Sequence, residues 1–370
     1  MTEAPTHLVR ESFQNLPSYK AGVSPGLLKA VASGKPVARL GSNENLYGTS
    51  PRVYEAIHSA SDVNLYPDGG STALREALAA HLRVDADRIL VSTGSENVLR
   101  AVFQSVLNPG DRVVSVQPTF LLAEILSQAS GAVHVGVPYE DDLEFRVEAL
   151  AGAAEKDPKI LYIANPNNPT GSAFSPDQLR TVLSRTPPET LVVLDEAYFE
   201  YAVHHEGFDS SLPVLEACGL PYVVLRTFSK AYGLAGLRVG YGIFYHPELV
   251  SLVLAGNTVF DVAAISQVAA LAALDDQVHL NQTVAATLAE KKRVLAALDA
   301  AGQRTFPAFG NFVSLWFSDR EDALDLERAL SEHAVFVKAL PARSREGLVR
   351  VTVGRPEDND RFLEALGRLR

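Results

Sequence analysis

The sequence predicts an α/β protein whose core is a mostly parallel sheet covered by helices on both faces. From about residue 50 to 270, short apolar runs alternate with segments of helical periodicity, which is typical of strand–helix–strand units. A second observation is that distinctive polar residues follow these apolar runs. Ligands of open parallel sheets bind beyond the carboxyl ends of the strands, so the polar residues are expected to form one crevice.

Six segments have the composition of buried strands. They are residues 88–91, 112–116, 159–163, 191–194, 222–225 and 237–244. Helices are predicted between them. Ser175, Pro176 and Gln178 form a helix start with a capping box, and residues 98–107 carry one apolar face that ends at the turn formed by residues 108–110.

The pattern changes along the chain and predicts three parts. Residues 1–45 are irregular and form an N-terminal segment, or lid, associated with a small domain. Residues 46–275 form a large three-layer αβα domain. Residues 276–370 form a smaller α+β domain, because a long helical stretch (247–300) is followed by further strand and helix patterns. These strands are predicted at 312–317, 335–340 and 348–353, with helices near 321–333 and 356–369.

Composition excludes several classes of function. The formal net charge of −11 argues against non-specific binding to nucleic acid or to an anionic membrane surface. The single cysteine excludes a disulfide framework within the chain, and the nine histidines show no metal-ligand spacing. The N-terminus lacks the pattern of a secretory signal, and no apolar run is long enough to span a bilayer. We therefore expect a cytoplasmic protein without metal, nucleic acid or membrane partners.

Lys230 is the most informative residue. It follows the predicted strand at 222–225, where a partly desolvated amine can act as a nucleophile. Thr227 and Ser229 offer hydroxyl groups beside it, and Arg238 offers a guanidinium eight residues on. Such a cluster suits a phosphate next to an aldehyde, as in pyridoxal 5'-phosphate (PLP) joined to a lysine as a Schiff base. Most lysines are solvated surface charges, so the interpretation depends on the other strand ends.

Two of those strand ends allow alternative interpretations. Gly94, Ser95 and Glu96 open a helix whose free backbone N–H groups can cradle a phosphate, although Thr93 and Glu96 also fit a capping box. Asp195 ends a buried apolar strand, where an unpaired carboxylate is costly. A protonated pyridine nitrogen would keep it ionised, while a helix N-cap or a structural ion pair is an equal alternative.

Three further residues complete the candidate set. Asn168 lies in a turn-rich segment, and it could reach a phenolate oxygen together with Tyr198. Phe120 could stack on a flat ring, although an aromatic residue belongs more often to the core. Each residue is a weak signal alone, but their joint order and spacing are hard to produce otherwise.

These motifs resemble those of the fold-type-I PLP-dependent aminotransferases of class I/II and, within that group, the histidinol-phosphate aminotransferases. The matching stretches are residues 42–48, 66–69, 93–96, 165–171, 195–198, 229–240 and 348–354. The resemblance implies PLP as cofactor, attached to Lys230, with Asp195 at the pyridinium nitrogen. It implies a homodimer in which Tyr66 reaches the cofactor phosphate of the neighbouring subunit.

The resemblance also assigns the other candidate residues. It implies that Asn168 and Tyr198 contact the ring oxygen and that Phe120 lies against the ring. It implies that six residues bind the cofactor phosphate: Gly94, Ser95, Glu96, Thr227, Ser229 and Arg238. The catalytic residues would be Lys230, Asp195 and Tyr198. Substrate would be bound by Arg350, Lys338, Asn45 and Tyr19.

The implied reaction is transamination of L-histidinol phosphate with 2-oxoglutarate, giving imidazole-acetol phosphate and glutamate in histidine biosynthesis. Two positions depart from the family pattern, because Phe120 replaces a common tyrosine and Lys338 replaces a common arginine that grips phosphate with two donors. Aromatic amino acids as donors, or a phosphothreonine-type decarboxylation, are therefore alternatives. A PLP-binding transcription regulator would need a basic helix-turn-helix domain, and the acidic charge of the chain argues against one. A nicotinamide-dependent dehydrogenase would need a G-x-G-x-x-G turn, which residues 93–97 do not supply.

Overall fold

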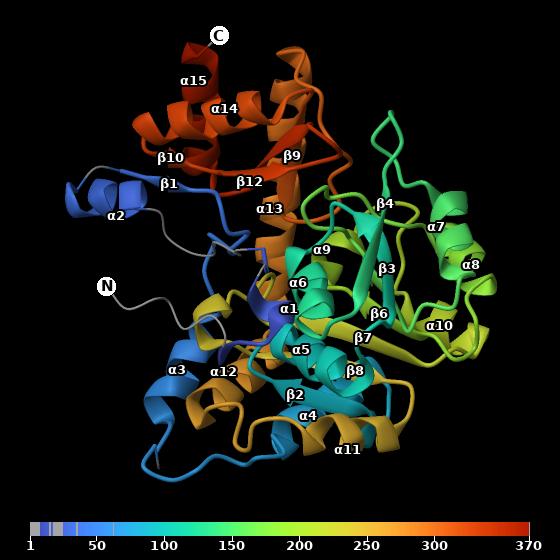
Figure 1. Ribbon diagram of the computed structural model, residues 1–370. Helices are drawn as coiled ribbons and strands as arrows, with labels where there is room; N and C mark the ends of the chain where they lie inside the picture. Colours follow the sequence, from blue (N-terminus) through green and yellow to red (C-terminus); the bar gives the residue numbers. More distant parts are fainter. Residues whose placement is uncertain (1–7, 15, 18–24, 35, 62, 370) are drawn as a thin grey trace.

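The computed structural model describes residues 8–14, 16–17, 25–34, 36–61 and 63–369. Its centre is a seven-stranded sheet in the order β2-β8-β7-β6-β5-β3-β4 (Figure 1). The strands are β2 (Ile89–Ser92), β3 (Arg112–Gln117), β4 (Val133–Pro138), β5 (Ile160–Ala164), β6 (Leu191–Asp195), β7 (Tyr222–Thr227) and β8 (Gly240–Phe244). Strand β8 is antiparallel to both neighbours, and the remaining neighbouring pairs are parallel. The predicted, mostly parallel sheet is confirmed.

Two strand predictions need correction. Residues 237–244 do not form one strand, because a short 3-10 turn, η3 (Ala235–Leu237), is followed by Arg238 in the left-handed region at φ 52°. The strand begins only at Gly240, where Ser95 N would lie 2.1 Å from an added Cβ, so only glycine fits. Strand β4 was not predicted, because it lies at the sheet edge with partly exposed residues and contains Gly136 and Pro138.

Helices cover both faces of the sheet, as predicted. One face is packed by α5 (Ser95–Val106), α6 (Leu121–Ala129) and α11 (Pro247–Ala255). The other is packed by α3 (Pro51–Ser59), α4 (Thr72–Leu82), α7 (Val147–Ala154), α8 (Pro176–Ser184), α10 (Leu212–Cys218) and α12 (Ala264–Asp275). The strands contribute alternate residues to the two cores, since successive side chains point to opposite faces. The predicted capping box of Ser175 and Gln178 is present at the start of α8.

The C-terminal part forms a second, smaller sheet in the order β11-β12-β9. Its strands are antiparallel: β9 (Phe312–Phe317), β11 (Lys338–Pro341) and β12 (Gly347–Thr352). They pack with α14 (Arg320–Glu332) and α15 (Pro356–Arg368). The predicted strand 335–340 is divided, because β10 (Val335–Phe336) pairs instead with β1 (Ala38–Arg39) from the N-terminal region. This pairing forms a separate two-stranded sheet that joins β1 to the C-terminal part of the chain.

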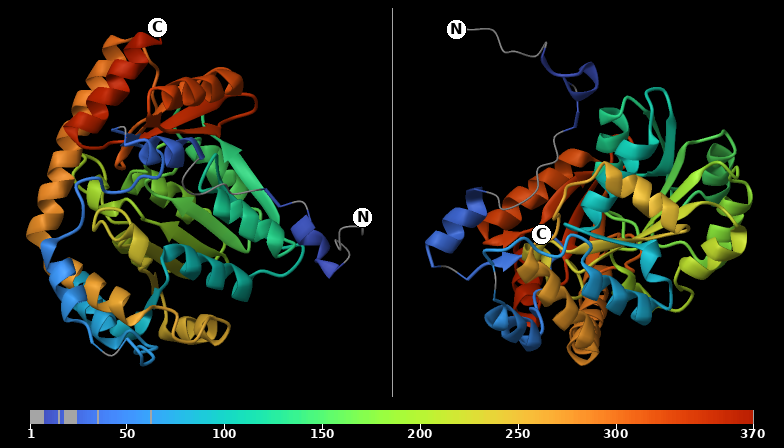
Figure 2. Two further views of the ribbon diagram at one scale, coloured as in Figure 1. Left: turned by 90° about the vertical axis from the view of Figure 1, so that its left-hand side faces the viewer. Right: turned by 90° about the horizontal axis from the view of Figure 1, so that it is seen from below.

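The long helix α13 (Gln277–Ala300) runs from the level of α12 towards the smaller sheet (Figures 1 and 2). The remaining helices of the described chain are short: α1 (Glu11–Gln14), α2 (Pro25–Ala32), α9 (Phe199–Ala202) and the 3-10 helix η2 (Ala86–Arg88). In the described ranges no helix combines the length and apolarity needed to cross a membrane. The same ranges contain no cluster of three or more histidine, cysteine or acidic side chains suited to a metal ion.

A buried lysine on α13 makes protein stability depend on pH. Lys291 is 2% exposed, and its amine donates to the carbonyl of Gly310 at 2.8 Å and lies 2.9 Å from Nε2 of His205. Burial lowers the pKa of Lys291 from 10.5 to about 7. Between pH 7 and pH 10.5 Lys291 is protonated in the unfolded chain and largely neutral in the folded protein. The free energy of unfolding therefore rises with pH in this range.

We expect Lys291→Met to be more stable than the parent protein at pH 7, since methionine needs no proton released and no charge buried. This advantage should shrink by about 1.4 kcal/mol per pH unit as pH rises towards 10. Urea unfolding of both proteins at several pH values measures the difference. A difference that stays constant with pH would contradict a lowered pKa for Lys291.

Candidate active site

The carboxyl ends of the parallel strands meet at one edge of the large sheet, and the predicted polar residues gather there. Lys230 follows β7, and its Nζ donates to the carbonyl oxygen of Ser42 at 3.1 Å. The amine lies 5.8 Å from the centre of the Tyr198 ring. Burial lowers the pKa of Lys230 to about 8, and the positive charge of Arg350 acts in the same direction. A lysine with this pKa has a substantial neutral fraction near physiological pH and can serve as a nucleophile or base.

Asp195 ends β6, the strand beside β7, and is 7% exposed. Its Oδ2 accepts from the Tyr162 hydroxyl at 3.0 Å, and its Oδ1 accepts from the backbone N–H of Ala197 at 3.1 Å. Burial raises the pKa of Asp195 to about 6 even with these donors. The alternative of a structural ion pair is not found among the described residues, and α9 has Tyr198 rather than Asp195 at its N-cap position. A cationic ligand group would therefore stabilise the ionised carboxylate.

The start of α5 forms a cradle rather than a capping box. Gly94 is the N-cap residue at φ 82°, and no side chain caps the helix. The alternative interpretation of Thr93 as the capping residue was wrong, because its hydroxyl donates to Asp261 instead, at 2.6 Å. The N–H groups of Ser95 and Glu96 belong to the first turn, where a helix supplies no acceptor of its own. This geometry suits an anion.

The basic and hydroxyl groups expected around that anion lie beside Gly94. A Cβ on Gly94 would come within 2.9 Å of Nη2 of Arg238, so the glycine makes room for the guanidinium. Nη1 of Arg238 donates to the Ser229 hydroxyl at 3.3 Å, and the Thr227 hydroxyl accepts from the Ser229 N–H at 3.1 Å. Glu96 lies 3.9 Å from the same guanidinium. Backbone donors, two hydroxyls and one guanidinium thus lie close together, a combination suited to binding a phosphate group.

Gly94→Ala should weaken binding of a phosphorylated cofactor about tenfold or more. The new methyl group would strain a left-handed backbone and displace the Arg238 guanidinium, and a hydrogen bond to a charged group is worth about 1.5–3 kcal/mol. Titration of PLP into the apoprotein, followed by absorbance, measures the change in Kd. Gly236→Ala is the matched control, because an added Cβ there meets no atom within 4 Å. Equal Kd values for the two variants would exclude the cradle.

The three residues predicted to contact the cofactor ring also contact other residues of the protein. The Tyr198 hydroxyl accepts from Nδ2 of Asn43 at 2.9 Å. Oδ1 of Asn168 accepts from Nη1 of Arg350 at 2.6 Å. Phe120 is partly buried at the start of α6, where it packs against the core. Asn168 and Tyr198 therefore reach the edge where Lys230 lies, and the role of each in cofactor binding stays a prediction.

The predicted substrate residues lie on different elements. Arg350 on β12 donates through Nη2 to the carbonyl of Gly41 at 2.7 Å, and it stands opposite Lys338 in the register of β11 and β12. Asn45 donates through Nδ2 to the carbonyl of Ala231 at 2.8 Å, which ties the N-terminal segment to the loop after Lys230. The Tyr19 prediction lies outside the described residues.

Tyr66 lies elsewhere on the surface. It is 82% exposed, and its ring stacks on Phe260 with centroids 4.5 Å apart. No contact joins it to Lys230 within the described chain. This position agrees with the expected role towards a second subunit, which stays a prediction.

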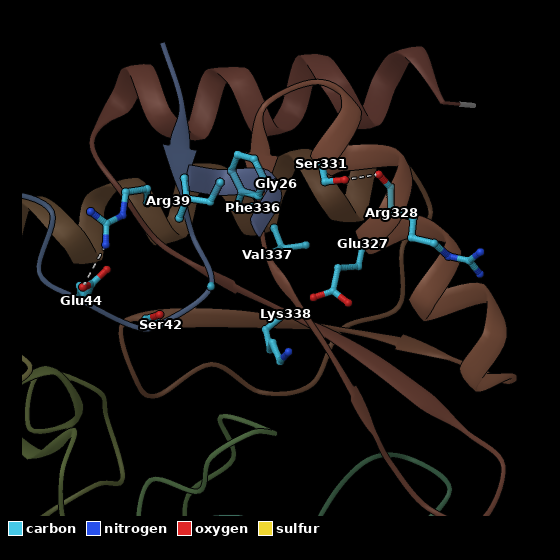
Figure 3. Close-up of a pocket in the computed structure, with 12 residues that line it drawn as sticks. Gly26, Arg39, Ser42, Glu44, Glu327, Arg328, Ser331, Phe336, Val337 and Lys338 are labelled. Carbon is cyan, nitrogen blue, oxygen red and sulfur yellow. Dashed lines mark hydrogen bonds and ion pairs between the residues drawn. The ribbon is translucent and has the colours of Figure 1, made fainter. Parts of the chain in front are cut away.

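A cavity of about 410 Å³ lies between β1, α14 and the β10–β11 segment (Figure 3). Lys338 and Ser42 line it, and Ser42 is also the residue whose carbonyl accepts from Lys230. The other charged residues at its wall are Arg39, Glu44, Glu327 and Arg328. Figure 3 shows the Glu327 carboxylate on the same side of the cavity as Lys338. The cavity thus lies beside the Ser42 contact of Lys230, and its wall carries three cationic and two acidic side chains.

Several supporting residues were not singled out from the sequence. Tyr162, which bonds Asp195, lies inside an apolar strand and gave no signal beyond its hydroxyl. Asp261 accepts from Ser92, Thr93 and Asn97 and so supports the turn before Gly94. It lies far along the chain in a segment without a motif. Only its position after Phe260, next to glycine- and asparagine-containing turns, could have indicated a role.

Comparison with known proteins identifies the family. The family model for aminotransferases of class I and II matches residues 35–366. The chain belongs to the class I and II aminotransferases. Histidinol-phosphate aminotransferase 2 of Caulobacter vibrioides is 40% identical to it, covering 99% of this chain and 95% of that protein. Histidinol-phosphate aminotransferase 3 of Rhizobium meliloti is 39% identical, covering 98% and 97%.

Solved structures show the same architecture. Histidinol-phosphate aminotransferase from Sinorhizobium meliloti, in complex with pyridoxal-5'-phosphate, has a TM-score of 0.86 at 29% identity, covering 98% of both chains. An aspartate aminotransferase variant from Thermus thermophilus has a TM-score of 0.80 at 23% identity and shares the fold. The predicted aminotransferase fold, and with it the enzyme class, is confirmed.

Proposed function

We propose that this class I and II aminotransferase transfers the amino group of L-histidinol phosphate to 2-oxoglutarate, with PLP bound at Lys230, as a cytoplasmic step of histidine biosynthesis. The observation that carries the proposal is the joint geometry of Lys230, Asp195 and the Gly94 cradle at one sheet edge. Curated relatives that are 39–41% identical over most of their length are histidinol-phosphate aminotransferases. PLP supplies an aldehyde that exchanges between amines and a ring that withdraws electrons.

The protein groups have distinct proposed roles around that cofactor. Asp195 would hold the pyridine nitrogen protonated, which explains a carboxylate retained in a buried position that raises its pKa. The α5 start and Arg238 would hold the phosphate. Tyr198, kept in place by Asn43, would donate to the ring oxygen together with Asn168. Phe120 would pack against the ring.

Lys230 would act twice. Its amine would first hold the cofactor covalently, and after the substrate amine has replaced it, Nζ would remove the proton from the amine-bearing carbon of the substrate. A pKa of about 8 places the amine near the value at which a general base works at neutral pH. Arg350 and Lys338 would bind the acidic end of the substrate, with Asn45 and the N-terminal segment closing over it.

The donor can be identified by single-turnover experiments on the PLP-loaded enzyme. Stopped-flow absorbance of the cofactor should show a much faster half-reaction with L-histidinol phosphate than with phenylalanine. A large preference for phenylalanine would replace the proposed donor by an aromatic amino acid. Release of carbon dioxide from a phosphorylated amino acid would indicate the decarboxylase alternative.

Lys338→Met should raise KM for histidinol phosphate about tenfold to a hundredfold, because a hydrogen bond to a charged group contributes about 1.5–3 kcal/mol. The value of kcat should change little, since Lys338 is proposed to contact the phosphate and not the reacting carbon. Steady-state kinetics with phenylalanine serve as the control, because that donor carries no phosphate. An equal rise in KM for both donors would contradict phosphate recognition by Lys338.

We further propose a homodimer in which Tyr66 reaches the cofactor phosphate of the second subunit. Support comes from a group of exposed apolar side chains around Tyr66. This group consists of Val63, Leu65, Tyr66, Val259 and Phe260. Such a patch is unusual on a monomer and typical of an interface.

Tyr66→Phe should weaken PLP binding, while sedimentation should still report a dimer.

A further inference from the structure

A buried ion pair joins the two strand ends that carry the cofactor residues. Glu196 directly follows Asp195 at the end of β6, and Arg226 is the residue before Thr227 at the end of β7. The side chains of Glu196 and Arg226 are 0% and 6% exposed. Oε2 of Glu196 accepts from Nε of Arg226 at 2.9 Å and from Nη2 at 2.7 Å. Two donors on one oxygen fix the guanidinium and the carboxylate in a single arrangement.

Each partner is held from further directions. Oε1 of Glu196 accepts from the backbone N–H of Ser211 at 2.8 Å, so both carboxylate oxygens are engaged. The Arg226 guanidinium donates to the Ser210 hydroxyl at 3.2 Å and lies 3.5 Å from the centre of the Phe199 ring. Contacts with the loop before α10 and with the start of α9 therefore hold the pair in place.

A backbone hydrogen bond also joins the ends of β6 and β7. The N–H of Glu196 donates to the carbonyl of Leu225 at 2.9 Å, which is the last contact of the β6–β7 ladder. Other titratable groups that interact with Arg226 are Glu200, Tyr232, Tyr241 and His81. Arg226 opposes the effect of burial on the Glu200 carboxyl, whose pKa rises to about 7. The guanidinium is thus the central charge of a buried polar cluster directly beneath the site.

Stability alone does not account for such a pair. Removing two ions from water costs several kcal/mol each, and apolar residues of similar volume in place of a buried pair are often neutral or stabilising. The benefit of a buried two-donor contact is a unique geometry. At these positions, that geometry sets how the end of β6 lies against the end of β7.

We propose that the Glu196–Arg226 pair is a positioning device that fixes the Asp195 carboxylate relative to Lys230 and the Thr227–Ser229 hydroxyls. The inference rests on the proposed function, because Asp195 and Lys230 are assigned there to the two sides of one cofactor ring. The two side chains form hydrogen bonds with each other and with Ser210 and Ser211, so neither side chain is expected to touch the cofactor. Their effect is transmitted through the adjacent residues of each strand.

The experiment uses the full chain loaded with PLP and two kinds of variant. Glu196→Leu/Arg226→Met replaces the pair by apolar residues and leaves no buried charge unpaired. Arg226→Lys keeps the charge but loses the two-donor contact. In the absence of PLP we expect both to unfold at a urea midpoint close to that of the parent. In both, kcat should fall at least about tenfold and the Kd for PLP should rise at least about tenfold.

Two readouts separate positioning from a merely structural role. The circular dichroism of the bound cofactor reports its tilt and should change in both variants, whereas KM for the 2-oxo acid should change less than about threefold. Parental kcat, Kd and dichroism in either folded variant would overturn the proposal. So would a large loss of urea stability in both ligand-free variants, since the pair would then serve folding.

The control variant carries the corresponding apolar pair at Glu155 and Arg185, which form an exposed ion pair between α7 and α8. It should keep the parental kcat, Kd for PLP and dichroism. Failure of the proposed function has a different signature. In that case the parent itself would show no PLP-dependent transamination, and its dichroism would report no bound cofactor.

Discussion

Lys230→Ala should abolish covalent PLP binding and lower kcat by at least about 10³-fold. General acid–base catalysis alone contributes about 10²–10⁴, and the variant loses the attachment amine as well. The absorbance of the lysine-bound cofactor should disappear, while PLP stays weakly held by the cradle at Gly94. Absorbance spectra before and after dialysis measure the first effect, and single-turnover kinetics measure the second.

Lys230→Arg distinguishes charge from chemistry at this position. Arginine keeps a positive charge but is never deprotonated in proteins, so it should be as inactive as alanine. Lys159→Ala is the matched control, because Lys159 lies at the opposite end of the sheet, before β5. Substantial transamination by either Lys230 variant would refute the assignment of Lys230 as the catalytic amine.

The fold was predictable because the strands of a parallel sheet are buried on both faces. Residues 160–164 and 191–195 are uniformly buried, and their apolar runs have no alternation that could be confused with an amphipathic helix. Edge strand β4 lacked this signal. The segment from 237 to 244 was misjudged, because its apolar composition hid the left-handed residue Arg238, which the site needs to aim the guanidinium.

The site was predictable to the level of strand ends and no further. Parallel strands bring their carboxyl ends to one edge, so Lys230 and Asp195 could be placed there by position alone. The contact between Arg350 and Asn168 joins residues 182 positions apart, and no local pattern encodes it. The bonds of Asn43 and Asn45 likewise depend on how the N-terminal segment crosses the molecule. Such contacts follow from packing between distant segments.

Asp195→Asn should lower kcat by about 10²-fold or more. Asparagine keeps the size of aspartate and can still accept from Tyr162 or Ala197, so the change isolates the negative charge. Without that charge the cofactor nitrogen would lose its proton, and the ring would withdraw electrons less strongly. Single-turnover rates with saturating donor and PLP measure the effect. A variant that binds PLP and keeps the parental rate would show that the carboxylate charge is not required.

The same substitution should stabilise the protein when PLP is absent. The pKa of Asp195 is about 6 in the folded protein, against 3.8 as the ordinary value, so between these values the folded state binds the additional proton. The free energy of unfolding then falls as pH rises through this window, by up to about 3 kcal/mol in total. At pH 7.5 the ligand-free Asp195→Asn variant should therefore unfold at higher urea concentration than the parent. Near pH 4 the two should converge.

Adding PLP should reverse this order at pH 7.5, because the cofactor supplies the cation that the buried carboxylate lacks. Binding to the folded state alone raises stability in proportion to the logarithm of ligand concentration over Kd, and the parent has the lower Kd. Urea midpoints of both proteins with and without PLP measure the crossover. If the parent gained no more from PLP than the variant, the carboxylate would not face the cofactor. The unfavourable burial of Asp195 would then be without a functional counterpart.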